Sequence, residues 1–592
     1  DIAKSPEAVR NIREVGFNGI QFYNFGRYRK DRRDVCDFSC QCAAYEEAQK
    51  LGMVFVPFAS YGNTSWNQWW RGSMILSSDG FDKAKEEDAL AYYDAFRESP
   101  RNLAVCLADE PSIAQFPWWK DSDCKAAFKT RFGQELTNDK KSRNYYDSFK
   151  FIADRQADML KYGTSFFKKY NPDTGTWAAL NLGDSMFNTN INKVASTLDY
   201  PGIDHYEYRA DPYALDLLWS ASDFSDRMWL VPTTSILYDN KYYPEYAGLQ
   251  AYYALCHNAK GMAWWIWDGI FGIDDNAREN PPSMNYFKRV CAELSTLGPL
   301  FNHISRARSD IAMLFPWTTS ILSTDTRTQD VRLWKDTHIL LRRAFGQVDF
   351  LHEEQIRRGV FLPDSKVLVL AGARYLPEDV AQKIKDWTAA GGILIILPGP
   401  PAYNQYQEKS DTLSEICSAE YGAEISAPVK GGSGIPVRGF VLNPSTAQIL
   451  LQYNNGSAAA TSATYGTGRV ICFGFEPDNA LVANAVKEAA IGRAVSSNHD
   501  IDVSYFPADG GFYVTAVNQI RKDVYTEIKV QKSKSPCYAY DILTGKEVPC
   551  VTKNGTVTIS VGIEPMWGKV IACLPSKPLR TARDGNDRST AE

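Results

Sequence analysis

Residues 103–112 read Leu-Ala-Val-Cys-Leu-Ala-Asp-Glu-Pro-Ser. The apolar half predicts a buried strand, and Pro111 predicts its end because proline cannot donate a backbone hydrogen bond to a sheet. Asp109 and Glu110 follow this strand directly. Since burying two unpaired carboxylates would be costly, we expect both acids at the rim of a sheet. The alternative is that Asp-Glu-Pro-Ser caps the start of a helix.

The alternation of amphipathic stretches and short apolar runs extends from residue 5 to about residue 270. Helices are predicted at 5–15, 43–51, 83–99 and 145–170, and strands at 19–23, 54–58, 103–107, 176–180, 202–206, 228–232 and 261–267. Apolar runs separated by helices are typical of buried parallel strands. A (β/α)8 TIM barrel needs eight strands, so we infer that the first one is lost, replaced or placed at the very start.

Two further regions follow the predicted barrel. A strand at 310–315, a strand at 366–372, a helix at 377–390 and a strand at 393–397 predict a small doubly wound α/β sheet. Alternating apolar and polar residues after residue 500 predict an antiparallel β-sandwich. The predicted domains are therefore the barrel (1–300), the α/β domain (305–495), the sandwich (500–577) and a disordered tail (578–592).

Composition excludes several classes of protein. The 592 residues carry 65 Lys and Arg against 70 Asp and Glu, so the net charge of −5 does not favour nucleic-acid binding. No apolar run is long enough to span a membrane. Cys36, Cys40 and Cys42 have no nearby His and are interpreted as buried thiols, so neither a metal nor a cofactor is expected. The abrupt start at Asp1 suggests a processed chain, and we expect a secreted or periplasmic protein.

The aromatic surplus and the acids at strand ends point to carbohydrate chemistry. Glu110 lies near Trp118 and Trp119 in sequence, and apolar neighbours suit a carboxylic acid to protonating a glycosidic oxygen. Glycoside hydrolysis needs a second carboxylate. Acids and polar residues at or after the ends of the strands predicted at 202–206 and 261–267 are candidates: Asp204, His205, Tyr206, Glu207, Asp268, Asp274 and Asp275. Aromatic residues at the same rim could stack on sugar rings.

The whole chain resembles the family-42 glycoside hydrolases, which are β-galactosidases. The resemblance rests on residues 104–111, 124–133, 229–232 and 391–396, and on the order of barrel, flavodoxin-like or amidotransferase-like domain and small sandwich. It implies that Glu110 is the general acid, that a galactoside is the substrate and that the protein is a trimer. With it, we expect a glycosidase whose catalytic residues are Glu110, Glu207 and Asp268. Expected substrate-binding residues are Asp109, Gln21, Asn24, His205, Tyr206, Trp66, Trp118, Trp264 and Trp267.

The chain departs from the family pattern at three places. Asp109 stands where the family has Asn, and Gln21 stands where it has Arg. The family's nucleophilic glutamate should follow the strand at 228–232, but the chain reads Pro232-Thr233-Thr234 there. The nucleophile of the family is therefore missing from its usual place.

Three hypotheses remain open from the sequence. The first is a glycoside hydrolase with a relocated carboxylate, for which an inverting mechanism is the simplest because water replaces the nucleophile. The second is an inactive barrel that binds an oligosaccharide or polysaccharide through its aromatic rim. The third is a polysaccharide lyase that uses His205 and Tyr206.

Overall fold

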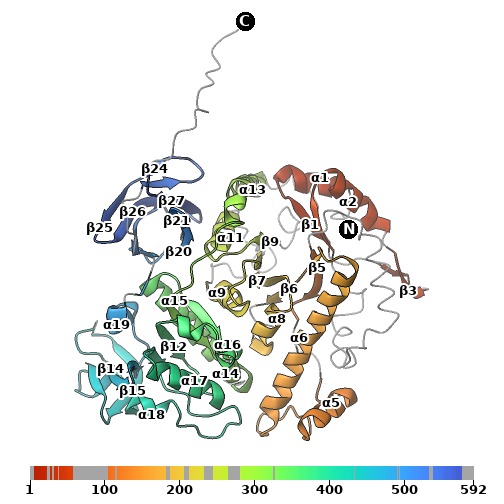
Figure 1. The fold of residues 1–592 in the computed structure, drawn as a ribbon. Coiled ribbons are helices and arrows are strands. Elements are labelled where there is room, and N and C mark those ends of the chain that lie inside the picture. The colour runs from red at the N-terminus through yellow and green to blue at the C-terminus, as the bar shows by residue number, and fades with distance from the viewer. Residues whose placement is uncertain are drawn as a thin grey trace.

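The computed structural model describes most of the chain. Three parts can be distinguished in it: an N-terminal part, a middle part and a C-terminal part (Figure 1). The described residues are 6–22, 27–29, 32–37, 39–57, 104–111, 113, 117–181, 187–205, 212–232, 245–264, 281–323, 327–432, 434–489, 491–492, 494–531 and 538–576. Most of the gaps within residues 19–280 directly follow the ends of the predicted barrel strands. The structure therefore describes the strands themselves and not the segments after them.

The N-terminal part alternates helices with parallel strands, as the sequence predicts. Its helices are α1 (Pro6–Val15), α2 (Ser39–Lys50), α5 (Ser122–Phe132), α6 (Tyr145–Tyr170), α8 (Ile191–Ala195), α9 (Pro212–Ala221), α11 (Tyr246–Cys256) and α13 (Pro281–Phe301). Its strands are β1 (Gly19–Phe22), β4 (Val54–Pro57), β5 (Ala104–Asp109), β6 (Gly175–Asn181), β7 (Tyr200–His205), β8 (Trp229–Pro232) and β9 (Gly261–Met262), with a hairpin of β2 (Arg27–Arg29) and β3 (Arg32–Asp37).

The parallel strands have two distinct faces. β1 pairs with β4, and β5 to β9 form a five-stranded sheet in sequence order. Alternate side chains of β5, β6 and β8 form one hydrophobic cluster, and we call the surface they share the inner face: Ala104, Cys106, Trp177, Ala179, Trp229 and Val231. The residues between them join the large core that includes residues of α6, α9 and α11. The strands are thus buried on both faces, as parallel strands usually are.

The middle part is built on a nine-stranded mixed sheet. Its strand order is β11-β10-β12-β13-β18-β17-β15-β14, with β16 paired to β17. Its elements are β10 (Ile311–Phe315), α14 (Trp317–Leu322), α15 (Arg327–Phe345), β11 (Asp349–His352), α16 (Glu353–Arg358), β12 (Val367–Ala371), α17 (Glu378–Ala389), β13 (Ile393–Leu397), α18 (Ser414–Cys417), β14 (Ala419–Pro428), β15 (Pro436–Pro444), β16 (Gln448–Gln452), β17 (Ala458–Tyr465), β18 (Gly468–Phe473) and α19 (Asn479–Ala485).

The parallel half of this sheet matches the predicted doubly wound pattern, but the antiparallel arm was not predicted. β14 to β17 extend the sheet by four strands. Many residues of β14, β15 and β16 are exposed, so these strands lack the apolar runs by which buried strands are recognised. β17 and β18 are joined by a hairpin turn in which Gly466 has a φ of 61°.

The C-terminal part consists of two antiparallel sheets. One has the order β19-β22-β26-β25 and the other β20-β21-β27-β23-β24. The strands are β19 (Ala494–Ser496), β20 (Ile501–Ala508), β21 (Gly511–Asn518), β22 (Val524–Gln531), β23 (Tyr538–Asp541), β24 (Glu547–Val548), β25 (Cys550–Lys553), β26 (Thr556–Ile563) and β27 (Gly568–Leu574). Side chains of β22 alternate between buried and exposed, as the sequence pattern predicts for a sheet with one solvated face.

The carboxyl edge of the middle sheet, where open α/β sheets usually bind ligands, packs against the N-terminal part. The Ser320 hydroxyl on α14 donates to the Phe187 carbonyl at 3.1 Å, and the ring of Trp317 lies 6.4 Å from that of Phe149 on α6. Beneath α14, Glu353 accepts hydrogen bonds from the backbone N–H of Thr318 at 2.8 Å and from its hydroxyl at 2.6 Å. This edge is therefore an internal contact.

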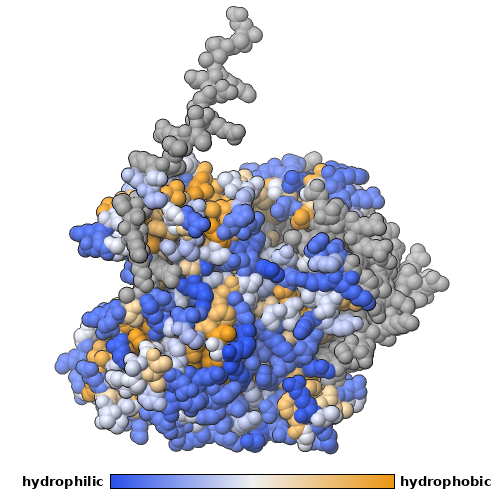
Figure 2. Space-filling model, viewed as in Figure 1, coloured by the Kyte–Doolittle hydropathy of each residue, from blue (hydrophilic) through white to orange (hydrophobic). Residues whose placement is uncertain are grey.

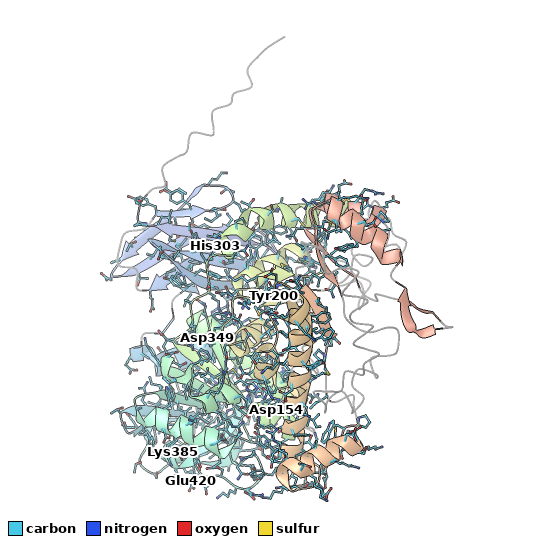
Figure 3. All side chains as sticks on the ribbon, turned by 45° about the vertical axis from the view of Figure 1, so that its right-hand side comes forward. Asp154, Tyr200, His303, Asp349, Lys385 and Glu420 are labelled. Atoms are coloured by element: carbon cyan, nitrogen blue, oxygen red, sulfur yellow. The ribbon has the colours of Figure 1, made fainter. Side chains whose placement is uncertain are left out.

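A buried ion-pair network joins the three parts, and we call it the junction. His257, which follows α11, lies between Asp216 of α9 at 2.7 Å and Asp502 of β20 at 2.8 Å. Arg342 of α15 donates to both carboxylates. Arg306 pairs with Asp216 and also, at 3.4 Å, with Asp349 of β11. Asp349 is labelled in Figure 3.

The charges at the junction follow from its geometry. Burial alone would raise the pKa of Asp216 and Asp502, but Arg342 and His257 beside both, together with Arg306 beside Asp216, hold their pKa values below the usual range. His257 bridges the two carboxylates, with one at each ring nitrogen.

The outer surface is mostly hydrophilic in the view of Figure 2, with hydrophobic residues in separate groups. The large hydrophobic side chains that are exposed include Ile435, Tyr525 and Val551. Among the described helices, none is both long and apolar enough to cross a membrane.

The junction predicts a large effect of removing one charge. Asp502→Asn leaves Arg342 and His257 buried beside a neutral amide, and we expect the free energy of unfolding to fall by about 3–5 kcal/mol. Calorimetry would measure this as a lower thermal midpoint. Asp523→Asn, in an exposed turn of the same part, is the matched control and should leave the midpoint unchanged. Equal midpoints for the two variants would contradict the assigned role of the junction.

Glu353 predicts a pH dependence of stability. Burial raises its pKa from 4.5 to about 7, despite the nearby Arg357 and the hydrogen bonds from Thr318. The folded state therefore holds this proton more tightly than the unfolded state, so its contribution to stability is full below pH ~4.5 and is lost as the pH rises through ~7. Glu353→Gln should abolish this loss. The stability of the variant, measured relative to that of the wild type, should therefore be higher at pH 8 than at pH 5. The exposed Glu420→Gln should show no such difference in its thermal midpoints.

Candidate functional site

The richest predicted strand end carries a backbone distortion. The register of β5 against β6 shifts between Cys106 and Ala108, so that Asp109 pairs with Ala179. Such a bulge inserts an extra residue and re-aims the strand that follows, and bulges are common beside active sites. Nothing in the apolar run reveals this shift in advance.

Glu110 lies at the carboxyl end of β5 in a left-handed conformation. Its φ is 43°, and its backbone N–H donates to the Ala179 carbonyl at 2.9 Å. A residue before proline strongly prefers extended backbone, so this conformation is unfavourable by about 1–3 kcal/mol. The Glu110 side chain is half-buried, and Pro111 after it is buried. The strain is held by the surrounding structure, which makes this carboxylic acid a candidate for function.

A second acid lies on the inner face. Asp204, near the end of β7, is 2% exposed. A Cβ on Gly202 would meet the ring of Trp177 at 3.0 Å, and Tyr200 stacks on Trp229 with ring centroids 5.0 Å apart. Since residues two apart on a strand share a face, Tyr200, Gly202 and Asp204 all lie on the inner face. Tyr200 is labelled in Figure 3.

His205 lies on the opposite face from Asp204. It is 1% exposed, and its ring lies 5.7 Å from that of Tyr253 on α11. Tyr253 in turn contacts His257 of the junction, with ring centroids 4.4 Å apart. His205 therefore packs behind the sheet and not among the inner-face residues, and we do not retain it as a substrate-binding residue.

Gln21 is placed on the inner side of β1. It pairs with Val56, whereas the neighbouring pair of Ile20 and Phe55 packs toward α1 and α2. Gln21 is half-buried. This position is compatible with the predicted contact to a sugar, which stays a prediction.

Two of the predicted aromatic residues have packing roles. Trp118 is 3% exposed and packs edge-on against Phe149 of α6, with centroids 6.4 Å apart. Trp264 packs edge-on against Phe287 of α13 at 4.9 Å. Core packing accounts for the ring of Trp118, whereas Trp264 is only partly buried and its predicted contact with a sugar stays a prediction.

The remaining predicted site residues lie outside the described part of the chain. These are Asn24, Trp66, Tyr206, Glu207, Trp267 and Asp268. The side chain of Asp109 is also outside it, although its backbone is described. β8 ends at Pro232, which pairs with His205, and Thr233 and Thr234 follow outside the described residues.

One group of residues of the metal-ligating type occurs among the described residues. Cys256, His257 and Asp502 are buried and offer atoms within 4.8 Å of one another. Both nitrogens of His257 already face carboxylates, and Arg342 already pairs with Asp502. With a carboxylate at each ring nitrogen, His257 has no nitrogen left for a metal, so these residues belong to the junction.

The comparisons with known proteins agree on the fold. No family model and no curated protein matches the sequence. Among solved structures, a β-galactosidase from Bacillus circulans sp. alkalophilus matches with a TM-score of 0.76 at 14% identity over 97% of each chain. A GH42 β-galactosidase from G. stearothermophilus matches with a TM-score of 0.74 at 13% identity over 95% of each chain.

A neighbour with another specificity shares the same architecture. An α-L-fucosidase isoenzyme 2 from Paenibacillus thiaminolyticus matches with a TM-score of 0.67 at 10% identity over 97% of this chain and 96% of the other. The fold alone therefore does not select the sugar. The chain has the fold of the GH42 β-galactosidases over nearly its whole length, as the resemblance in its sequence implies.

Proposed function

We propose that this protein is a glycoside hydrolase acting on a galactoside-like carbohydrate, with Glu110 as the general acid. The observation that carries the proposal is the strained, half-buried Glu110 at the carboxyl end of a parallel strand. In (β/α)8 enzymes catalytic residues lie at such strand ends. The fold shared with β-galactosidases supports the same reaction class.

The proposal includes a closed barrel. β1 and β4 form one described sheet, β5 to β9 form another, and β4 lies beside β5. Side chains from both sheets belong to one hydrophobic cluster, with Val56 of β4, Cys106 of β5 and Val231 of β8 among them. A ring of strands around this cluster would bring the carboxyl ends together in one mouth.

The alternatives have less support. A polysaccharide lyase using His205 would need that side chain at the mouth, but it packs against Tyr253 behind the sheet. An inactive carbohydrate-binding barrel would have no use for a strained acid at a strand end, because strain is retained where the surrounding structure serves a function.

Glu110→Gln tests the proposal directly. The amide cannot donate a proton to the leaving oxygen, so we expect kcat/KM on natural galactosides to fall about 10²–10⁴-fold. Release of reducing ends from galactose-containing oligosaccharides measures this. The exposed Glu135→Gln is the control and should retain full activity. Unchanged hydrolysis by Glu110→Gln would contradict the assignment, and unsaturated products would favour the lyase.

A further inference from the structure

We infer that Asp204 is the second catalytic carboxylate and acts as the general base that activates water, so that the reaction inverts the anomeric configuration. This inference rests on the proposed function. It assigns to a described residue the role that the missing glutamate after β8 leaves open.

The sheet places Asp204 and Glu110 at the same edge. β5, β6 and β7 are neighbouring parallel strands, so their carboxyl ends coincide. Asp204 pairs with Asn181 of β6, and Asp109 pairs with Ala179 of the same strand. Glu110 and Asp204 are therefore separated by one strand across the sheet and by about one residue along it.

This separation suits a water-activating pair. Two strand spacings of about 4.8 Å and one rise of about 3.3 Å put the two backbones about 10 Å apart. Inverting enzymes hold their carboxyl groups about 6.5–9.5 Å apart, whereas a nucleophilic pair needs about 5–5.5 Å. Two side chains that lean modestly toward each other would bring the carboxyl groups to the separation found in inverting enzymes. Only strongly converging side chains would reach the shorter separation of a nucleophilic pair.

The surroundings of Asp204 also suit a base. Val231 of β8 pairs with Asp204 and belongs to the inner-face cluster, so it offers apolar surface beside the carboxylate.

The reaction balances as a single displacement. Glu110 gives its proton to the glycosidic oxygen, and the bond between that oxygen and the anomeric carbon breaks, its electron pair leaving with the alcohol. A water oxygen forms the new bond from the opposite face while Asp204 takes one proton from that water. Solvent then removes the proton from Asp204 and returns one to Glu110, so the net reaction adds one water molecule.

Leaving-group dependence separates the two roles. A dinitrophenyl galactoside needs no protonation to leave, so Glu110→Gln should retain activity on it while losing activity on natural galactosides. Asp204→Asn should lose about 10²–10⁴-fold in kcat on both substrates, because each needs the activated water. Asp173→Asn, an exposed carboxylate before the amino end of β6, is the matched control and should keep wild-type activity.

The stereochemistry of the wild-type reaction tests the inference without any variant. Proton NMR during early turnover should detect a product of inverted configuration. A retained product, or an Asp204→Asn variant with wild-type kcat, would overturn the role of Asp204 while leaving Glu110 as the acid. If the wild-type protein hydrolyses no glycoside at all, the proposed function and this inference both fail.

Discussion

The fold depends on the buried His257, which is held between the carboxylates of Asp216 and Asp502. Each carboxylate comes from a different part of the chain, and Arg342 from the middle part closes the network. Removing one member of such a buried network is costly, because a remaining charge would lose its partner in the interior. It thereby fixes how the three parts meet.

The junction also sets the environment of the strands that carry the candidate site. All residues of α9, and all residues of α11 after Tyr246, are buried, since these helices lie between the parallel strands and the other two parts. His257 contacts Tyr253, and Tyr253 contacts His205 of β7. The face of β7 opposite to the inner face is therefore packed against α11. This packing holds the strand, and with it the backbone of Asp204, in place.

Much of the architecture could be predicted from sequence periodicity. The helix predicted at 145–170 is observed as α6, and the strand before Glu110 is observed as β5. Sequence periodicity did not reveal which of the expected substrate-binding side chains face the core. His205 and Trp118 have the right chemistry for a sugar site but pack into the core. The alternation of side chains along a strand could have shown this. It places Tyr200, Gly202 and Asp204 on one face of the sheet and His205 on the other.

The sequence by itself determined the alternation of helices and parallel strands, the acid after β5 and the absence of a glutamate at the end of β8, because these depend on local residue order. Only the tertiary structure decided the bulge in β5, the left-handed Glu110 and the junction. The physical reason is that strand register and buried charge pairing arise between segments far apart in the chain. No local pattern encodes which face of a strand a distant helix will cover.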